Sequence, residues 1–94
     1  MAASYNNIGM VYDSQGKYEE ALEYYQKDLE ITIKVVGHDH PDVATSFQNI
    51  AALYYNQGNQ VQAKEMATKA YSILLKVLGP DHPQTEVVKS FYHL

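Results

Sequence analysis

Apolar residues recur along the chain every three or four positions, which is the spacing of one face of an α-helix. Near the amino end this face is formed by Tyr5, Ile8 and Tyr12, and the same spacing returns at Ile50 and Tyr54. No segment alternates apolar and polar residues over the length of a strand. We therefore expect an all-α domain with helices at roughly 2–15, 18–36, 41–57, 60–78 and 83–93.

The chain repeats itself when it is shifted along its own sequence so that Met1 aligns with Val43. Of the 41 residue pairs from Met1/Val43 to Pro41/Pro83, 17 are identical. Each unit reads as a helix–turn–helix pair, and such units bury their apolar faces by stacking. We expect one domain over residues 1–94, with a first unit at about 1–40 and a second at about 41–82. Residues 83–94 then begin a third unit or form a capping helix.

Glycine and proline mark the expected helix ends. Gly16 and Gly58 follow the shorter helices, and Gly37 and Gly79 follow the longer ones. Glycine often ends a helix because it accepts the left-handed conformation. The Asp-His-Pro segments that come next, at 39–41 and 81–83, place proline in a first helical turn and Asp or His where a capping side chain belongs.

Charge and composition remove several functional classes. The net charge is −4 and the seven basic residues are scattered lysines, so we expect no nucleic-acid partner. No apolar run approaches the roughly 18 residues of a membrane span, so we expect no membrane partner. The absence of cysteine suits a reducing compartment, and we expect a cytoplasmic protein.

Catalytic and metal-binding patterns are not visible. The sequence has no phosphate-binding glycine loop and no nucleophile paired with a base, so we expect no enzyme and no cofactor. His38, Asp39 and His40 could suggest a metal site, but zinc needs three or four converging ligands and His40 has a capping role. We expect no metal site.

The repeated positions resemble the tetratricopeptide repeat. That motif combines an aromatic, an aliphatic, a small residue and a tyrosine in one helix, a turn glycine, and aromatic and alanine positions in the next. The first unit supplies Tyr5, Ile8, Gly9, Tyr12, Gly16, Tyr18, Ala21 and Tyr25, and the second supplies Phe47, Ile50, Ala51, Tyr54, Gly58, Ala63 and Ala70. The resemblance implies antiparallel helix–turn–helix repeats stacked as a right-handed solenoid, with the tyrosines at motif positions packed. Tyr24 falls outside the motif positions, and we expect it at the surface.

Departures from the motif fall at a few positions. Asp28 stands where alanine is usual, and Gln60 and Ala67 stand where aromatics are usual. The period also exceeds the ordinary length of about 34 residues. A 42-residue period with Gln-Gly-Lys-Tyr-Glu-Glu-Ala at 15–21 and Val-x-Gly-x-Asp-His-Pro-Asp-Val-Ala at 35–44 is similar to the kinesin light chain type of repeat.

The resemblance implies a concave surface lined by the first helix of each unit. Its positions here are Ala3, Asn6, Asn7, Met10, Asp13, Ser14, Thr45, Gln48, Asn49, Ala52, Tyr55 and Asn56. We predict as ligand contacts Asn6, Asn7, Met10, Asp13, Gln48, Asn49, Ala52, Tyr55 and Asn56. Amides can bind a peptide backbone of any sequence. Asn7 and Asn49 either hold a bound segment or satisfy helix ends and face water, and Asp13 would accept a basic ligand residue.

The predicted function is a scaffold that binds a protein or an extended peptide on its concave face. The alternative is a purely structural module whose units stack with other copies and whose groove binds nothing. A homo-oligomer could form through the end faces or through helix exchange if the turn at residues 57–59 straightened.

Overall fold

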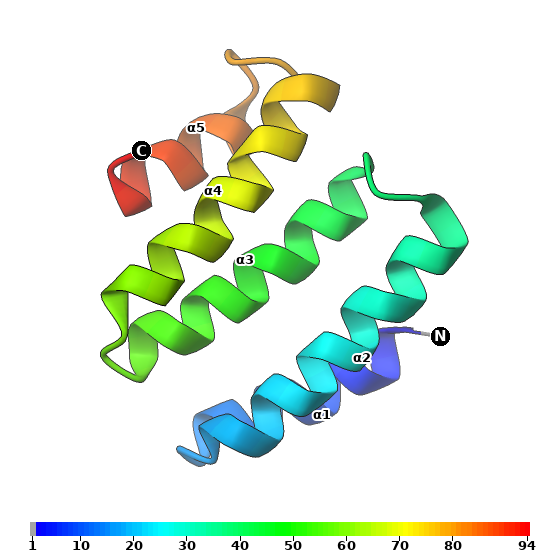
Figure 1. Ribbon diagram of the computed structural model, residues 1–94, viewed down its shortest axis with the longest axis vertical. Helices are drawn as coiled ribbons and strands as arrows, with labels where there is room; N and C mark the ends of the chain where they lie inside the picture. The colour runs from blue at the N-terminus through cyan, green and yellow to red at the C-terminus, as the bar shows by residue number, and fades with distance from the viewer. Residues whose placement is uncertain (1) are drawn as a thin grey trace.

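A computed structural model describes the backbone of residues 2–94 and the side chains from residue 5 onward. It contains α1 (Ala2–Ser14), α2 (Tyr18–Val36), α3 (Pro41–Asn56), α4 (Gln60–Val77) and α5 (Pro83–Tyr92), and no strand within residues 2–94 (Figure 1). The all-α prediction is confirmed. Four helices end one residue earlier than expected. Two of these ends are followed by Gln57 and Leu78, which keep helical backbone angles but act as C-caps.

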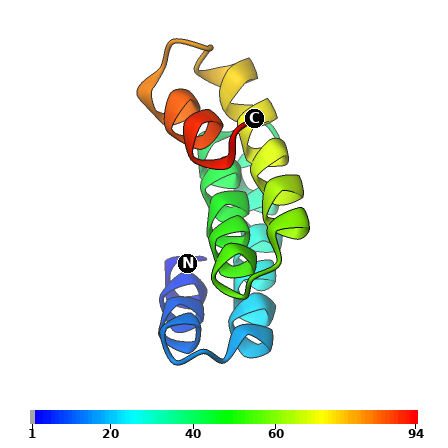
Figure 2. The ribbon, with the colours of Figure 1, turned by 90° about the vertical axis from the view of Figure 1, so that its left-hand side faces the viewer.

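The helices pack in the order in which they follow one another along the chain. Figure 2 shows α1 and α5 on one side of the molecule and α2 and α4 on the other, with α3 between them. Packing is most extensive within the pairs α1–α2 and α3–α4, while α2–α3 and α4–α5 contacts join successive units. In this arrangement α3 packs against α2 and α4 and has its other side toward α1 and α5.

The predicted turn and capping signals are confirmed. Gly16 and Gly58 have φ values of 76° and 86°, in the left-handed region that favours glycine. The His40 Nδ1 atom accepts a hydrogen bond from the Asp42 backbone N–H at 3.0 Å, and His82 Nδ1 accepts one from Gln84 at 3.2 Å. Each histidine precedes a proline in the first helical turn, so the two Asp-His-Pro segments begin α3 and α5 in the same way.

Two apolar clusters hold the stack together. The first joins α2 to α3 and the second joins α3, α4 and α5. Their buried members are Ala21, Tyr25, Ile50 and Leu53 in the first, and Ala44, Ala51, Ala67, Ala70, Leu74 and Val88 in the second. Burying one leucine or isoleucine side chain contributes about 1.5–3 kcal/mol, so both clusters are substantial for a chain of this size.

Tyr24 departs from the prediction that it lies at the surface. Its ring is half-buried and stacks on Tyr5 and on Tyr12, with centroid distances of 6.1 Å and 5.6 Å. The two partners lie two helical turns apart on α1, so a ring from α2 fits between them. Lys27 completes this group, with its Nζ atom 5.3 Å from the centre of the Tyr24 ring.

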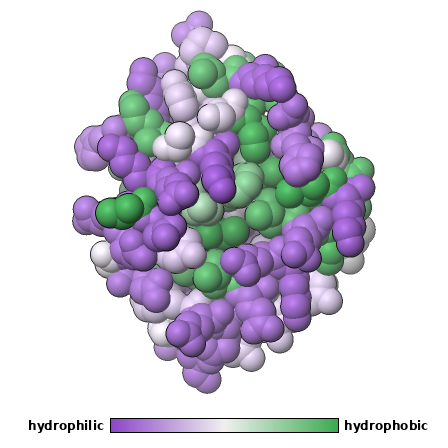
Figure 3. All heavy atoms as spheres, viewed as in Figure 1, coloured by the Kyte–Doolittle hydropathy of each residue, from purple (hydrophilic) through white to green (hydrophobic). Residues whose placement is uncertain are grey.

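The outer surface of the second helices is mainly polar. Figure 3 shows this side of the molecule, where hydrophilic side chains surround a smaller number of apolar ones. No helix within residues 2–94 is long and apolar enough to cross a membrane.

Candidate functional site

The nine predicted contact residues lie on α1 and α3, and every one of them is at least partly exposed. Asn7, Met10, Ala52, Tyr55 and Asn56 are exposed. Asn6, Asp13, Gln48 and Asn49 are half-buried. Ala3 was also placed on this surface, and its side chain lies outside the described residues.

Asn6 and Asn49 connect the two units. Asn49 donates from Nδ2 to Asn6 Oδ1 at 2.9 Å, across the space between α1 and α3. The Asn6 NH2 group and the Asn49 carbonyl form no other hydrogen bond among residues 5–94. Each of these amides therefore has one side committed to packing between units and another available to a ligand.

Asn7 and Asn49 are equivalent in sequence but not in environment. The Asn49 side chain donates to the preceding unit, whereas the Asn7 side chain is exposed and forms no hydrogen bond among the described residues. Equivalent positions in the two repeat units therefore do not have the same contacts. The hydrogen bond of Asn49 to Asn6 matches neither of the two interpretations given above, and ligand binding by Asn7 and Asn49 stays a prediction.

The fifth helix contributes side chains that the prediction omitted. Between α3 and α5 lies a shallow apolar groove. It is lined by Gln48, Asn49, Ala52, Val87, Val88, Phe91 and Tyr92. The Tyr55 and Phe91 ring centres are 5.4 Å apart at its end. The signal was present in the sequence, since Val87 and Phe91 lie one repeat period after the groove positions Thr45 and Asn49.

At the α1 end of the surface, the Asp13 carboxylate lies near the buried side chain of Tyr25. Burial raises the pKa of Tyr25 to about 12, and the neighbouring Asp13 carboxylate adds to this rise through its charge and a hydrogen bond. The Tyr25 hydroxyl, protonated at neutral pH like any tyrosine, can donate toward Asp13, and the raised pKa keeps it protonated under more alkaline conditions. A basic ligand residue at Asp13 would share that carboxylate with Tyr25.

A family model described as tetratricopeptide repeat matches residues 1–76. The chain belongs to the tetratricopeptide repeat family. The match runs from α1 almost to the end of α4, so it covers both complete helix pairs. Tetratricopeptide repeats are in general protein-interaction scaffolds without enzymatic activity.

The His38–His40 segment of this tetratricopeptide repeat chain has structural roles. His40 caps α3, and Asp39 forms an exposed ion pair with Lys76 at 2.7 Å that ties the loop to α4. No group of three His, Cys, Asp or Glu residues that could hold a metal ion occurs in the described part of the chain.

Proposed function

We propose that this chain is a binding module that holds an extended protein or peptide segment on the surface formed by α1, α3 and α5. The observation that carries the proposal is the groove between α3 and α5. There the exposed side chains of Val87 and Phe91 lie beside the amides of Gln48 and Asn49. Exposed apolar side chains next to uncommitted polar groups are typical of ligand sites.

The chemistry of the surface favours a segment of a particular kind. Amides can pair with backbone N–H and C=O groups, and Ala52, Val87 and Phe91 offer contact to an apolar ligand side chain. Asp13 favours a basic residue toward the α1 end. None of the nine predicted contacts is Lys or Arg, so capture of a terminal carboxylate by these residues is disfavoured.

Two finer parts of the proposal rest on the sequence. The 42-residue period and the Asp-His-Pro segments support placement in the kinesin light chain type of repeat. A cytoplasmic location stays a prediction based on the cysteine-free composition.

Calorimetry with a library-derived peptide tests the groove. A peptide selected on the full chain from a random phage-displayed library is titrated into the native chain, into Val87→Ser and into Val61→Ser. Val87 is 64 % exposed on α5 and Val61 is 80 % exposed on α4, outside the groove lining. We expect Val87→Ser to weaken binding about tenfold, corresponding to about 1.4 kcal/mol, and Val61→Ser to leave it unchanged. Equal affinity of all three chains contradicts the proposal.

Self-assembly is the second candidate function, and one observation favours it. Ile8 and Val11 on α1 are 39 % and 56 % exposed, while their equivalents in the second unit, Ile50 and Leu53, are 3 % and 0 % exposed. Those later residues are buried against Ala21 and Tyr25 of α2. The equivalent face of α1 is thus a stacking surface that a second copy could cover.

Sedimentation at several concentrations distinguishes this candidate from the groove. If the α1 face joins copies, the native chain associates as its concentration rises and Val11→Ser reduces that association. The matched control is Val77→Ser on α4, where valine is 41 % exposed. A native chain that remains monomeric throughout excludes self-assembly through this face and leaves peptide binding unaffected.

A further inference from the structure

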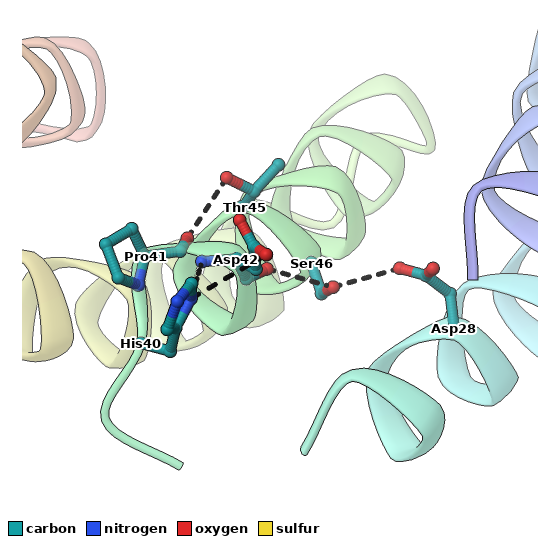
Figure 4. Close-up of polar contacts among 6 residues, drawn as sticks. All are labelled: Asp28, His40, Pro41, Asp42, Thr45 and Ser46. Carbon is teal, nitrogen blue, oxygen red and sulfur yellow. Dashed lines mark hydrogen bonds and ion pairs between the residues drawn. The ribbon is translucent and has the colours of Figure 1, made fainter. Parts of the chain in front are cut away.

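A buried polar pair joins the first unit to the second. Ser46 on α3 donates its hydroxyl proton to Asp28 Oδ2 on α2 at 2.9 Å. The two residues are 4 % and 6 % exposed, respectively. Figure 4 shows the Ser46 side chain pointing across the space between the helices toward the Asp28 carboxylate. Asp28 is the position at which the first unit departs from the alanine of its family motif.

The next junction has a different chemistry at the same positions. One repeat period further along the chain, Ala70 takes the place of Asp28 and Val88 takes the place of Ser46. Both are buried, and they belong to one apolar cluster that joins α4 to α5. The polar contact between the first and second units is therefore replaced by an apolar contact between the second unit and α5.

Asp28 depends strongly on its partner. Among residues 5–94 the Ser46 hydroxyl is the one side-chain donor to this carboxylate, and Asp28 forms no ion pair. A helix that placed an apolar residue such as Val88 opposite Asp28 would leave a buried carboxylate without a donor, which is strongly unfavourable.

Ser46, unlike Asp28, has a second hydrogen-bond partner within its own helix. Its hydroxyl also lies 3.3 Å from the Asp42 backbone carbonyl, one turn earlier in α3. Opposite Ala70 it could still donate to that carbonyl. The α2 face is thus the selective member of the pair, and the α4 face accepts apolar and hydroxyl residues alike.

We propose that Asp28 makes the stacking face of α2 selective for a helix with a hydroxyl residue at the position of Ser46, and that this selectivity excludes α5 of the same or of a second copy. The α3 and α5 helices begin with the same Asp-His-Pro cap and occupy equivalent places in the repeat. Without a chemical difference between the junctions, exchange of these helices between copies would meet little opposition.

The first part of the test measures dependence on the partner in the full chain. Ser46→Ala removes the hydroxyl without adding bulk, and we expect it to lower the urea midpoint of unfolding. Asp28→Ala with Ser46→Val, which copies the apolar junction, is expected to have a midpoint equal to or above that of the native chain. A Ser46→Ala midpoint equal to the native value overturns the proposal.

The second part measures selectivity. Each chain is unfolded, refolded at high concentration and then diluted, and the dimers that persist after dilution are counted by size-exclusion chromatography. Dimers formed by exchanged helices persist, whereas copies stacked through the α1 face separate. We expect the Asp28→Ala, Ser46→Val chain to give severalfold more persistent dimer than the native chain.

A four-residue variant provides the matched control. Adding Ala70→Asp and Val88→Ser to the two-residue chain makes the junction between α4 and α5 polar, while the junction between α2 and α3 stays apolar. The two junctions again differ in chemistry, and we expect the amount of persistent dimer to return to the native level. Equal dimer fractions in the native and two-residue chains overturn the proposal, as does a four-residue chain that exchanges as readily as the two-residue chain.

Discussion

The ring of Tyr25 lies against Gly9, so closely that a Cβ atom at position 9 would be 2.7 Å from Tyr25 Cε1. The equivalent positions of the second unit are Ala51 and Ala67, both fully buried. The two units therefore fill this position of the helix pair differently. The first unit combines the smallest residue, glycine, with a large tyrosine, and the second unit combines two alanines. The missing aromatic at position 67 is thus matched by a larger residue at position 51.

Gly9→Ala should destabilise the chain despite the higher helix propensity of alanine. Overpacking costs about 1–3 kcal/mol, whereas the higher helix propensity of alanine stabilises the helix by about 1 kcal/mol. Because the contact is with a buried ring, we expect a net loss of up to about 2 kcal/mol in the free energy of unfolding, measured by urea denaturation. In a Tyr25→Ala background the same change should stabilise. A stabilising Gly9→Ala in the native background would contradict the contact.

Thr85→Val should stabilise the chain. Thr85 is fully buried on α5 and its hydroxyl has no hydrogen-bond partner among the described residues, while the equivalent residue of α3 is Val43. Removing an unsatisfied buried hydroxyl gains about 1 kcal/mol, which thermal unfolding can measure. Val43→Thr is the reverse control and should lose stability. A lower melting temperature for Thr85→Val would indicate that the hydroxyl is satisfied.

Asp28 should make stability depend on acidity. Burial raises the pKa of its carboxyl, an effect that the Ser46 hydrogen bond partly opposes. The folded chain then holds this proton more tightly than the unfolded chain, so the group's contribution to stability falls as pH rises from the ordinary aspartate pKa through the raised one. Stability returns as pH falls through the same window.

We therefore compare the native chain with Asp28→Asn, which keeps the shape and removes the titration. As pH is lowered from neutral to about 4, the difference in free energy of unfolding should move in favour of the native chain. Urea titrations at each pH provide the measurement. A difference that is constant, or that moves toward Asp28→Asn on acidification, rejects this role of burial.

His40→Ala should remove the cap of α3. Its imidazole accepts the Asp42 N–H, and loss of a capping side chain costs about 0.5–2 kcal/mol. His38→Ala is the control, because His38 is exposed and forms no hydrogen bond among the described residues. Unfolding free energies of the two variants should differ by about 1 kcal/mol, with His38→Ala close to native. Equal values would mean that the cap contributes nothing.

The sequence predicted the features that depend on local spacing. The helices, the left-handed glycines and the histidine caps each follow from a few neighbouring residues, and all are found as expected. The partners of Tyr24 and Asn49 could not be predicted in this way. They depend on how α1 meets α2 and α3, which is set by packing across units and not by periodicity.

Two other features were within reach of the sequence but needed a second step. Applying the repeat offset once more would have extended the groove to Val87 and Phe91. The departure at Asp28 was visible in the sequence, but its role depends on the Ser46 hydroxyl on α3. That role becomes clear only when Ser46 is compared with Val88 at the equivalent position of α5.

The central claim is that a ligand lies on the surface of α1, α3 and α5. Its most direct test is amide chemical-shift mapping of the isotope-labelled full chain with a peptide selected from a random phage-displayed library. We predict that the shifts concentrate at Gln48, Asn49 and Ala52 on α3 and at Val87 and Phe91 on α5. Shifts concentrated on the outward faces of α2 and α4, or no peptide selected above background, would contradict the claim.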